Sequence, residues 1–533
     1  MKPKTLKKLT PARAVASVGE ETVIPCTNPA TGASLGEVPV DDPAAVRAAV
    51  LRAREAQRGW AETSFAQRRA VLRRLSDRIL ANTDALVDVV VTDAGKTREH
   101  ALMGEIWPVL EKLRWTIANG EKHLRPERVS PGVFVHKSAR LEFHPLGVVG
   151  AILPWNYPFQ NLMNPIIPAL MAGNACVVKP SEWVAWSAGG IIDLVRAALA
   201  DEGHSPELVQ LVQGYGPTGK ALIQSGIDSL LFIGSVPNGR RILEAAAEVL
   251  VPVTLELGGK DPLIVCDDAD LEQAVHAAMV GCFVNAGQNC VASERVLVFD
   301  GIYDRFVARA AGLVQNLRQG DPRVRPGEVD VGMMVSPMQR DLVERLVEDA
   351  VARGARLLAG GRRGPGTSYA PTLLVDVTPD MAIFQEETFG PVMAICRVHD
   401  EHEAVAIANG TPFALGSSVF SKDLGRARRL AGRLQAGMTA INEFGGTTYM
   451  AQDLPFGGVK HSGYGRMSGR EGLRAFTNIR AVLDDRLPLH FASPVFPVGP
   501  ADYARVKAAV ELMYGRGRAR LEGAKALLSG LFK

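Results

Sequence analysis

The sequence predicts an α/β protein with more than one domain. From Gly147 onward, short apolar runs alternate with stretches of helical periodicity, and a second block with the same alternation begins at Asp261. Such alternation is typical of βαβ units, in which helices connect the parallel strands of a sheet. At 533 residues the chain is too long for a single hydrophobic core, so two or three domains are expected.

The first alternating block predicts one doubly wound parallel sheet. Its five expected strands are Val148–Leu153, Ala175–Lys179, Leu208–Val212, Ser229–Ile233 and Val253–Leu257. Five strands with helices between them indicate a sheet that is covered on both faces. Before this block, the spacing of apolar residues from Ala44 to Gly120 predicts a mostly helical lead-in.

The second block predicts another α/β domain. Strands are expected at Leu263–Val265 and Arg295–Phe299, with a helix over Leu271–Val284 between them. A further extended segment, Val133–Glu142, falls outside this order. Because an isolated edge strand tends to pair with another chain or domain, we expect this segment to do so.

Composition narrows the class of protein. Apolar residues make up 47% of the chain and charged residues 22%, which is the profile of a globular protein. The net charge of +3 is too small to indicate a nucleic-acid partner, although basic residues gather in residues 1–13 and 501–533. The six cysteines form no CxxC pair and no Cys/His cluster, so we expect no metal site and a reducing compartment.

No segment is expected to cross a membrane. The longest apolar stretch, Ile166–Val178, is interrupted by Pro168, Gly173 and Asn174 and falls short of the ~20 residues that a span needs. The basic N-terminus is not followed by an apolar stretch, which does not support a secretory signal. We therefore expect a cytoplasmic protein.

Two glycine motifs are candidates for binding phosphate groups. Gly214–Gly219 reads GYGPTG, but no acidic residue follows at the usual spacing of about 20 positions, so a tight turn that lines a site is favoured over a pyrophosphate site. At Gly234 and Ser235 an expected strand stops and a helix begins, with Pro237 in its first turn. This motif is either a diphosphate site or an ordinary serine N-cap, and the sequence leaves both interpretations open.

The segment from Lys179 to Glu182 ends an expected strand. Open α/β sheets bind ligands at the carboxyl ends of their strands, where Lys179 and Glu182 can hold ribose hydroxyls. The simpler interpretation is a solvated turn with Ser181 as an N-cap.

Two residues are candidates for catalysis. Cys290 follows an apolar helix, and Gly287 before it lets the chain bend and expose the thiol as a nucleophile. A buried structural cysteine is the alternative. Glu256 is a lone carboxylate in an apolar strand, where it is either a general base with a raised pKa or part of a buried salt bridge. The cysteines expected to be buried are Cys176, Cys266 and Cys282.

Taken together, seven separated motifs resemble those of the aldehyde dehydrogenase superfamily, in the same order and from roughly Pro39 to Asp484. The motifs are PWNYP (154–158), KPSE (179–182), GS (234–235), ELGGK (256–260), GQNC (287–290), EETFGP (386–391) and PFGG (455–458).

This resemblance implies a reaction. Cys290 would attack the aldehyde carbon as a thiolate and form a thiohemiacetal. The Asn156 side chain and the Cys290 backbone N–H would hold the developing oxyanion. Hydride then leaves for the nicotinamide, and Glu256 would activate the water that hydrolyses the remaining thioester. The presence of this glutamate favours a free acid as the product.

The resemblance also implies an NAD site. The residues implied are Lys179 and Glu182 at the adenosine ribose, Gly234 and Ser235 at the diphosphate, Glu387 and Phe389 beside the nicotinamide ribose, and Gly214 and Gly216 on the adenine side, with Trp155, Ser181 and Leu257 completing the set. NAD is favoured because the Glu182 carboxylate would repel a 2′-phosphate, whereas Lys179 and Ser181 keep NADP as an alternative.

By the same resemblance, the fold is a Rossmann-like cofactor domain plus an α/β catalytic domain and a small bridging sheet used for oligomerisation. The expected boundaries are 1–122 with 147–258 for the NAD(P)-binding domain, 259–455 for the catalytic domain, 123–146 with 474–487 for the bridging segments, and 488–533 for a C-terminal extension with a basic amphipathic helix. A homodimer or homotetramer that acts on a small-molecule aldehyde is implied.

Three features depart from the family or leave alternatives open. Met467 follows Gly465-Arg466 where many members have a second glutamate, so Glu256 is the one base candidate. The presumed tunnel residues combine aromatic and polar side chains and do not identify the aldehyde. They are Tyr157, Gln160, Asn161, Asn164 and Phe456.

The C-terminal tail is the third feature. Its basic amphipathic stretch can lie on an anionic membrane surface, as in family members that oxidise fatty aldehydes, although its glycines weaken the helix and packing on the protein's own surface is the alternative. A catalytically silent relative is a further alternative, which the presence of Cys290, Asn156 and Glu256 disfavours.

Overall fold

A computed structural model describes residues 22–323, 327–486 and 496–530 of the chain. The described chain forms two compact units, one within residues 1–126 and 142–480 and the other within residues 127–141 and 481–533. The basic segment of residues 1–13 lies outside the described residues, as do residues 487–495 and 531–533.

The helical lead-in is confirmed. After the hairpin of β1 (Val23–Thr27) and β2 (Ser34–Pro39), the chain forms α1 (Pro43–Ala61), α2 (Phe65–Ala81), α3 (Thr83–Ala94), α4 (Arg98–Ala101), the π-helical turn η1 (Leu102–Ile106) and α5 (Trp107–Leu124). Side chains cap the N-termini of α1 and α2: Asp42 accepts a hydrogen bond from the Ala45 N–H at 2.7 Å, and Ser64 forms a capping box with Gln67.

The expected doubly wound sheet is present as a six-stranded sheet of order β17-β9-β8-β5-β6-β7. Its strands are β5 (Val148–Ile152), β6 (Ala175–Lys179), β7 (Val209–Leu211), β8 (Ser229–Gly234), β9 (Val253–Leu257) and β17 (Gly463–Tyr464). The first five are parallel and agree with the predicted ranges to within one residue, while β17 adds an antiparallel edge. The chain order reverses between β5 and β8, which makes a topological switch point there.

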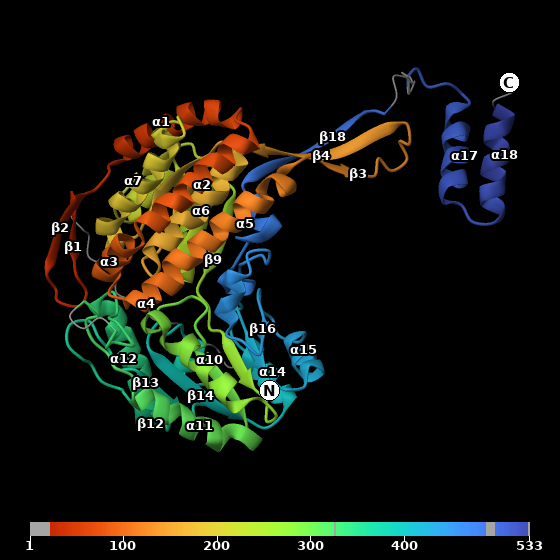
Figure 1. Cartoon of the computed structure of the whole chain (residues 1–533). Coiled ribbons are helices and arrows are strands. Elements are labelled where there is room, and N and C mark those ends of the chain that lie inside the picture. Colours follow the sequence, from red (N-terminus) through yellow and green to blue (C-terminus); the bar gives the residue numbers. More distant parts are fainter. Residues whose placement is uncertain (1–21, 324–326, 487–495, 531–533) are drawn as a thin grey trace. The chain divides into compact units, whose positions relative to one another are not determined.

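Helices cover this sheet (Figure 1). They are α6 (Pro158–Ala172), the 3-10 turns η2 (Glu182–Val184) and η3 (Pro206–Leu208), α7 (Ala185–Asp201), α8 (Gly216–Ile223) and α9 (Val236–Ala247). In the described part of the chain, one helical stretch, Glu182–Asp201, has the length and hydropathy to cross a membrane, and half of it is buried inside the protein. Because α7 packs on α2 and β7, this stretch has the features of a core helix.

The second α/β block forms a seven-stranded sheet of order β12-β13-β14-β11-β10-β15-β16. Its strands are β10 (Pro262–Val265), β11 (Arg295–Phe299), β12 (Arg356–Ala359), β13 (Thr372–Val375), β14 (Val392–Val398), β15 (Ser418–Phe420) and β16 (Ala440–Ile441). The expected strands at Leu263–Val265 and Arg295–Phe299 are confirmed as β10 and β11, and the helix expected over Leu271–Val284 is α10 (Leu271–Phe283).

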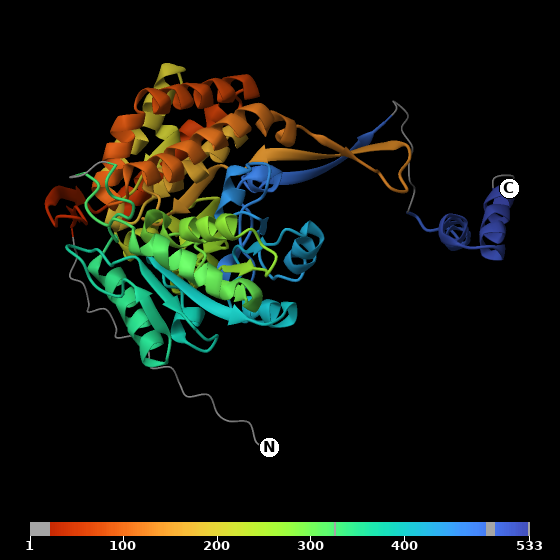
Figure 2. The ribbon, with the colours of Figure 1, turned by 60° about the horizontal axis from the view of Figure 1, so that its bottom comes forward.

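The helices of this block pack on its sheet. Helix α10 contacts β14, and α11 (Asp300–Gln315) contacts β11 and β13 (Figures 1 and 2). The remaining helices and turns of the first compact unit are α12 (Pro337–Ala352), α13 (Ala382–Gln385), α14 (Glu401–Asn409), α15 (Leu424–Ala431), α16 (Gly469–Arg474), η4 (Val284–Gly287), η5 (Gly445–Met450) and η6 (Lys460–Ser462).

A separate three-stranded sheet has the order β18-β4-β3. It consists of β3 (Glu127–Val129), β4 (Lys137–Pro145) and β18 (Thr477–Asp485). The strand predicted over Val133–Glu142 therefore begins four residues later and ends three residues later. The reason is a turn before it, in which Gly132 has φ +61° and the Lys137 N–H donates to the Phe134 carbonyl at 2.8 Å.

The C-terminal extension contains two helices, not the single basic amphipathic helix expected. Helices α17 (Asp502–Tyr514) and α18 (Arg518–Gly530) lie side by side (Figure 1). Gly517, at φ +54°, makes the break between them. Gly523 lies within α18 and faces α17, where a Cβ would be 2.6 Å from the Ala508 carbonyl oxygen.

Candidate active site

A left-handed turn presents Cys290. Three successive residues after α10, Asn285, Ala286 and Gly287, have φ between +53° and +70°. Only glycine fits at the last position, since a Cβ would lie 2.0 Å from the Gly390 carbonyl oxygen. The predicted bend at Gly287 is therefore confirmed, and it leaves the Cys290 side chain partly buried. The other five cysteines are free and buried, as predicted for Cys176, Cys266 and Cys282.

Cys290 and Glu256 meet at this turn. Glu256 lies inside β9, 2% exposed, close enough to Cys290 for the two groups to shift each other's pKa, while the thiol itself donates to Asn289 Oδ1 at 3.9 Å. Burial raises the pKa of Glu256 to about 8, and the neighbouring Cys290 thiol offsets part of that rise. Burial and then the Glu256 charge hold the pKa of the Cys290 thiol well above its usual value. The pair is thus a protonated thiol beside a base that titrates near neutral pH.

The buried salt bridge considered for Glu256 is absent from the described residues. No cation pairs with its carboxylate, and the buried Oε1 atom has no hydrogen-bond partner among them. A buried acceptor without a partner is costly unless a water or substrate atom satisfies it. This geometry favours the general base over the structural ion pair.

Asn156 is held beside the same turn. Its side-chain Nδ2 donates to the Gln288 carbonyl at 3.3 Å, and its Oδ1 accepts from Asn161 at 3.1 Å. Its main-chain carbonyl accepts from Lys96 Nζ at 2.7 Å and from Asn285 Nδ2 at 2.9 Å. The structure therefore joins the predicted oxyanion donor to the loop that carries Cys290.

The predicted cofactor residues of the first sheet gather at one edge. They follow the carboxyl ends of their strands: Trp155 after β5; Lys179, Ser181 and Glu182 at and after β6; Gly214 and Gly216 after β7; Gly234 and Ser235 at and after β8; and Leu257 at the end of β9. Open α/β sheets bind dinucleotides at this edge, close to the switch point. The switch between β5 and β8 lies between Trp155 and Ser235.

For Ser181, Ser235 and Lys179 the structure distinguishes between a structural interpretation and a ligand-binding one. Ser181 is an N-cap, as the simpler interpretation expected, because its hydroxyl accepts from the Trp183 N–H at 3.4 Å; it also donates to the Glu182 carboxylate at 3.0 Å. Ser235 precedes α9 without making a side-chain cap bond, so its hydroxyl remains available to a ligand at the helix N-terminus. Lys179 is buried, not solvated, and its ammonium donates to the Pro180 carbonyl at 3.1 Å.

The loop that carries Glu387 and Phe389 closes the site from the second sheet. The Glu387 carboxylate accepts the Gly259 N–H at 3.1 Å, and a Cβ at Gly258 would lie 2.4 Å from it. Burial, followed by repulsion from Glu294, raises the pKa of Glu387. The Phe389 ring meets the Trp155 ring edge-on, with 5.5 Å between their centres. Both residues are predicted to bind the same cofactor, and they are neighbours although they follow strands of different sheets.

Sequence reasoning missed the residues that hold this loop. Glu294 accepts hydrogen bonds from the N–H groups of Thr388 at 2.8 Å and Phe389 at 2.7 Å. Lys260 Nζ lies 2.5 Å from the Glu294 carboxylate and also donates to the Thr388 hydroxyl at 2.9 Å. The available signal was a charge at the border of each buried strand, Lys260 before β10 and Glu294 before β11, since buried charges require partners.

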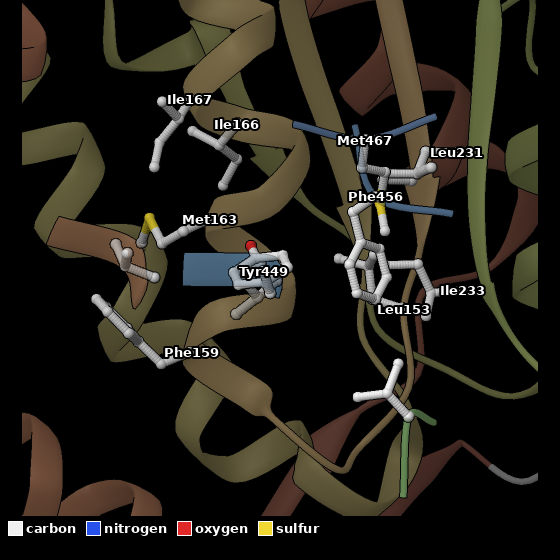
Figure 3. Packing of buried hydrophobic residues seen from close by; sticks show 14 of the residues in the cluster. Leu153, Phe159, Met163, Ile166, Ile167, Leu231, Ile233, Tyr449, Phe456 and Met467 are labelled. Carbon is white, nitrogen blue, oxygen red and sulfur yellow. The ribbon is translucent and has the colours of Figure 1, made fainter. Parts of the chain in front are cut away.

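The presumed tunnel residues lie along α6 and the segment after η5. Figure 3 shows Tyr449 beside α6 and Phe456 near the sheet strands, with Met467 next to Phe456. The Tyr449 hydroxyl donates to Asn164 Oδ1, and its ring meets Phe456 edge-on at 5.2 Å. Lys112, also missed, lies 5.6 Å above the Tyr449 ring, and burial lowers its pKa to about 7.

A parallel sheet with a switch point and a thiol beside a buried carboxyl are typical of an oxidoreductase that uses a dinucleotide. The family model described as "Aldehyde dehydrogenase family" matches residues 15–482, and the chain belongs to this family. Its cofactor is therefore NAD(P), and its reaction is the oxidation of an aldehyde.

Similar proteins cover almost the whole chain. The 4,4'-diapolycopene aldehyde oxidase of Methylomonas sp is 38% identical over 93% of this chain and 92% of that protein. A betaine aldehyde dehydrogenase of Cereibacter sphaeroides is 40% identical over 86% of this chain and 93% of that protein. Among solved structures, the betaine aldehyde dehydrogenase of Staphylococcus aureus in complex with NAD+ has a TM-score of 0.82 and 30% identity, over 89% of this chain and 94% of that chain.

Proposed function

We propose that this protein oxidises an aldehyde to its carboxylic acid through a thioester on Cys290, with Glu256 as the base. The contact between the Cys290 thiol and the buried Glu256 carboxyl supports this proposal most directly. The Cys290 thiol loses its proton to solvent, and the sulphur attacks the aldehyde carbon as a thiolate. Asn156 Nδ2 and the Cys290 N–H donate to the oxygen that becomes negative. When bound, NAD(P) accepts the hydride that the tetrahedral carbon releases.

Hydrolysis completes the reaction. Glu256 removes a proton from water, which attacks the thioester carbon, and the Cys290 sulphur leaves with the acid as the product. The unsatisfied Oε1 of Glu256 supports this role in hydrolysis, because a water there gains a buried acceptor. The balance is one aldehyde, one oxidised cofactor and one water consumed for each acid, reduced cofactor and proton released.

The cofactor assignment rests on the edge of the first sheet. Lys179, Ser181 and Glu182 lie at the carboxyl end of β6, where the adenosine ribose would bind. The Glu182 carboxylate favours NAD, since it would repel a 2′-phosphate. The division into a cofactor domain (1–122 and 147–258), a catalytic domain (259–455) and bridging segments (123–146 and 474–487), the cytoplasmic location and the homodimer or homotetramer belong to the same proposal.

The test is NADH or NADPH formation, followed by absorbance, with aldehydes of short and long aliphatic, aromatic, amino and semialdehyde types. The mixed lining of Tyr157, Gln160, Asn164, Tyr449 and Phe456 does not select one class, so the panel must span them. Turnover with NAD above NADP supports the proposal. The absence of turnover with every aldehyde contradicts it and favours the catalytically silent relative.

A second candidate function is aldehyde oxidation at a membrane surface. Four apolar side chains of α17, Tyr503, Val506, Val510 and Met513, are 48% to 79% exposed and recur at spacings of three and four, so they form one stripe. Residues 501–533 carry seven basic and three acidic side chains, so the extension suits an anionic lipid surface.

Vesicle co-sedimentation tests this candidate. Phosphatidylcholine vesicles with phosphatidylserine should retain the full chain, and vesicles without phosphatidylserine should retain less of it. A Val506→Asp/Val510→Asp variant should lose binding while keeping turnover of a short aldehyde. Equal recovery of the full chain with and without vesicles contradicts the membrane role. If the chain associates with itself when no vesicles are present, the apolar stripe of α17 binds a second copy of the chain instead of a membrane.

A further inference from the structure

Lys96 and Glu105 form an ion pair with no exposure to solvent. Lys96 Nζ lies 2.6 Å from Glu105 Oε1, and both side chains are 0% exposed. Lys96 follows the end of α3, and Glu105 lies in the π-helical turn η1. Placing two charges in the interior costs free energy that their attraction barely repays, so the pair needs a reason beyond stability.

The remaining contacts of the pair converge on one short turn. Lys96 Nζ donates to the Asn156 carbonyl at 2.7 Å and lies 4.1 Å from the centre of the Tyr157 ring. Glu105 Oε2 accepts the N–H groups of Phe159 and Gln160, both at 2.9 Å. The cation thus holds the carbonyl before α6, and the anion holds the first free N–H groups of that helix.

Gly104 leaves room for the Tyr157 ring to lie against η1. A Cβ on Gly104 would lie 2.6 Å from the Tyr157 ring. The contact therefore requires a close fit between η1 and the segment 156–160, and the buried charges are at its centre. The Asn156 carbonyl also accepts from Asn285, which belongs to the loop that carries Cys290.

We infer that Lys96 and Glu105 are positioning residues that fix Asn156 relative to Cys290. The inference rests on the proposed function, in which the Asn156 amide stabilises the oxyanion. Lys96 and Asn285 hold the same carbonyl, so the donor and the nucleophile loop share one anchoring point. A donor aimed by a rigid main chain loses no free energy in reorienting as charge develops.

A double-mutant cycle tests whether Lys96 acts through Asn156. Lys96→Met should lower kcat/KM by about 10- to 100-fold in the wild-type chain, less than the roughly 100- to 1,000-fold known for complete loss of one oxyanion donor, because the misplaced amide still donates in part. In an Asn156→Ala chain, Lys96→Met should lower kcat/KM by less than about 3-fold, because the amide that Lys96 positions is gone. An equal fold-loss in both backgrounds overturns the inference.

A charge-neutral variant separates positioning from the cost of an unpaired buried charge. Lys96→Met/Glu105→Gln removes both charges together and should fold, since breaking only one member leaves the other uncompensated. It should bind NAD and react with iodoacetamide at Cys290 within about twofold of wild type, because neither process needs the oxyanion donor. Its kcat/KM should fall by the same factor as that of Lys96→Met. A wild-type kcat/KM in this variant overturns the inference.

Hydrogen exchange gives a readout that does not depend on turnover. Amide exchange in a peptide covering residues 154–160 should be faster in Lys96→Met/Glu105→Gln than in wild type. Arg68→Met is the matched control, because Arg68 is a buried cation that donates to carbonyls of Ala61 and Met171, away from this turn. Unchanged exchange at 154–160 contradicts positioning. If the wild-type chain oxidises no aldehyde, the proposed function fails, and exchange still decides the positioning.

Discussion

Lys260 and Glu294 form a buried ion pair, with 2.5 Å between Nζ and Oε2 and side-chain exposures of 0% and 5%. The pair links the connection that follows Glu256 to the segment that follows Cys290. Through Glu294 it also holds the main chain at Phe389, which has the left-handed φ of +48°. A non-glycine residue keeps such a conformation only when its surroundings enforce it. The proposed base, the proposed nucleophile and the predicted nicotinamide loop are therefore linked through one pair of charges.

Glu294→Gln should loosen the nicotinamide loop. The amide leaves Lys260 buried without a counter-charge and keeps only one carbonyl acceptor for the two loop N–H groups. We expect a loss of roughly 3 to 5 kcal/mol in the free energy of unfolding and a higher KM for NAD, with a smaller change in the KM for aldehyde. Thermal unfolding and steady-state kinetics measure these effects.

The matched control for that variant is Glu207→Gln. Glu207 pairs with Arg52 at 3.0 Å, but the two side chains are 47% and 53% exposed, so the variant should change the free energy of unfolding by less than about 1 kcal/mol. If both variants unfold alike and both keep the wild-type KM for NAD, Glu294 does not support the loop.

Cys290→Ser should abolish dehydrogenase turnover while NAD still binds. A serine hydroxyl is a much weaker nucleophile than a thiolate, and the residues at the edge of the first sheet are untouched. Quenching of tryptophan fluorescence by NAD and NADH formation from an active aldehyde measure the two effects. Cys282→Ser is the control: Cys282 is buried within α10, so any loss there should be one of stability and not of chemistry. Normal turnover in Cys290→Ser would reject Cys290 as the nucleophile.

The strands and the site motifs could be predicted from sequence because each depends on a few adjacent residues. Apolar runs such as Ala175–Lys179 mark buried strands, and Gly287 marks a bend that no side chain tolerates. The supporting charges could not be predicted, because their partners are remote in sequence. Glu294 meets Phe389 across 95 positions and Lys96 meets Asn156 across 60.

Two errors in the predicted elements have local causes. The strand expected from Val133 includes alternating residues that belong to a turn, since Gly132 sets a left-handed conformation there. In the tail, sequence alone predicts that each glycine weakens the helix. Gly517 does break the helix, whereas Gly523 allows two helices to approach each other. Periodicity along one segment cannot distinguish a breaker from a contact between helices.

Glu256→Gln should form the thioester and then stall. The amide cannot take a proton from water, so one equivalent of NADH should appear rapidly and turnover should then fall by at least about 100-fold. Stopped-flow absorbance and mass spectrometry of the acylated Cys290 peptide detect the burst and the trapped intermediate. Steady turnover near the wild-type rate would exclude Glu256 as the base for hydrolysis.

The pH profile gives a second check on Glu256. Its pKa is raised from the usual 4.5 to about 8, so the carboxylate form that can act as a base becomes more abundant as the pH rises through 8. If hydrolysis limits turnover, kcat should increase roughly tenfold per pH unit below 8 and level off above it. In Glu256→Gln the residual rate should lack this limb. A wild-type kcat that is flat between pH 6 and 9 contradicts the assignment.

Gly287→Ala should damage both stability and activity. The residue has φ +70°, and the added methyl group would lie 2.0 Å from the Gly390 carbonyl oxygen, so the loop that carries Cys290 must move. We expect a loss of about 2 to 4 kcal/mol in the free energy of unfolding together with a large fall in kcat. Gly59→Ala is the control, because Gly59 lies in α1 and a methyl group added there would have no neighbour within 4 Å, so alanine should stabilise the helix by about 0.5 to 1 kcal/mol. Chemical denaturation of the two variants should therefore shift in opposite directions, and a Gly287→Ala protein with wild-type stability would show that the left-handed turn is not required.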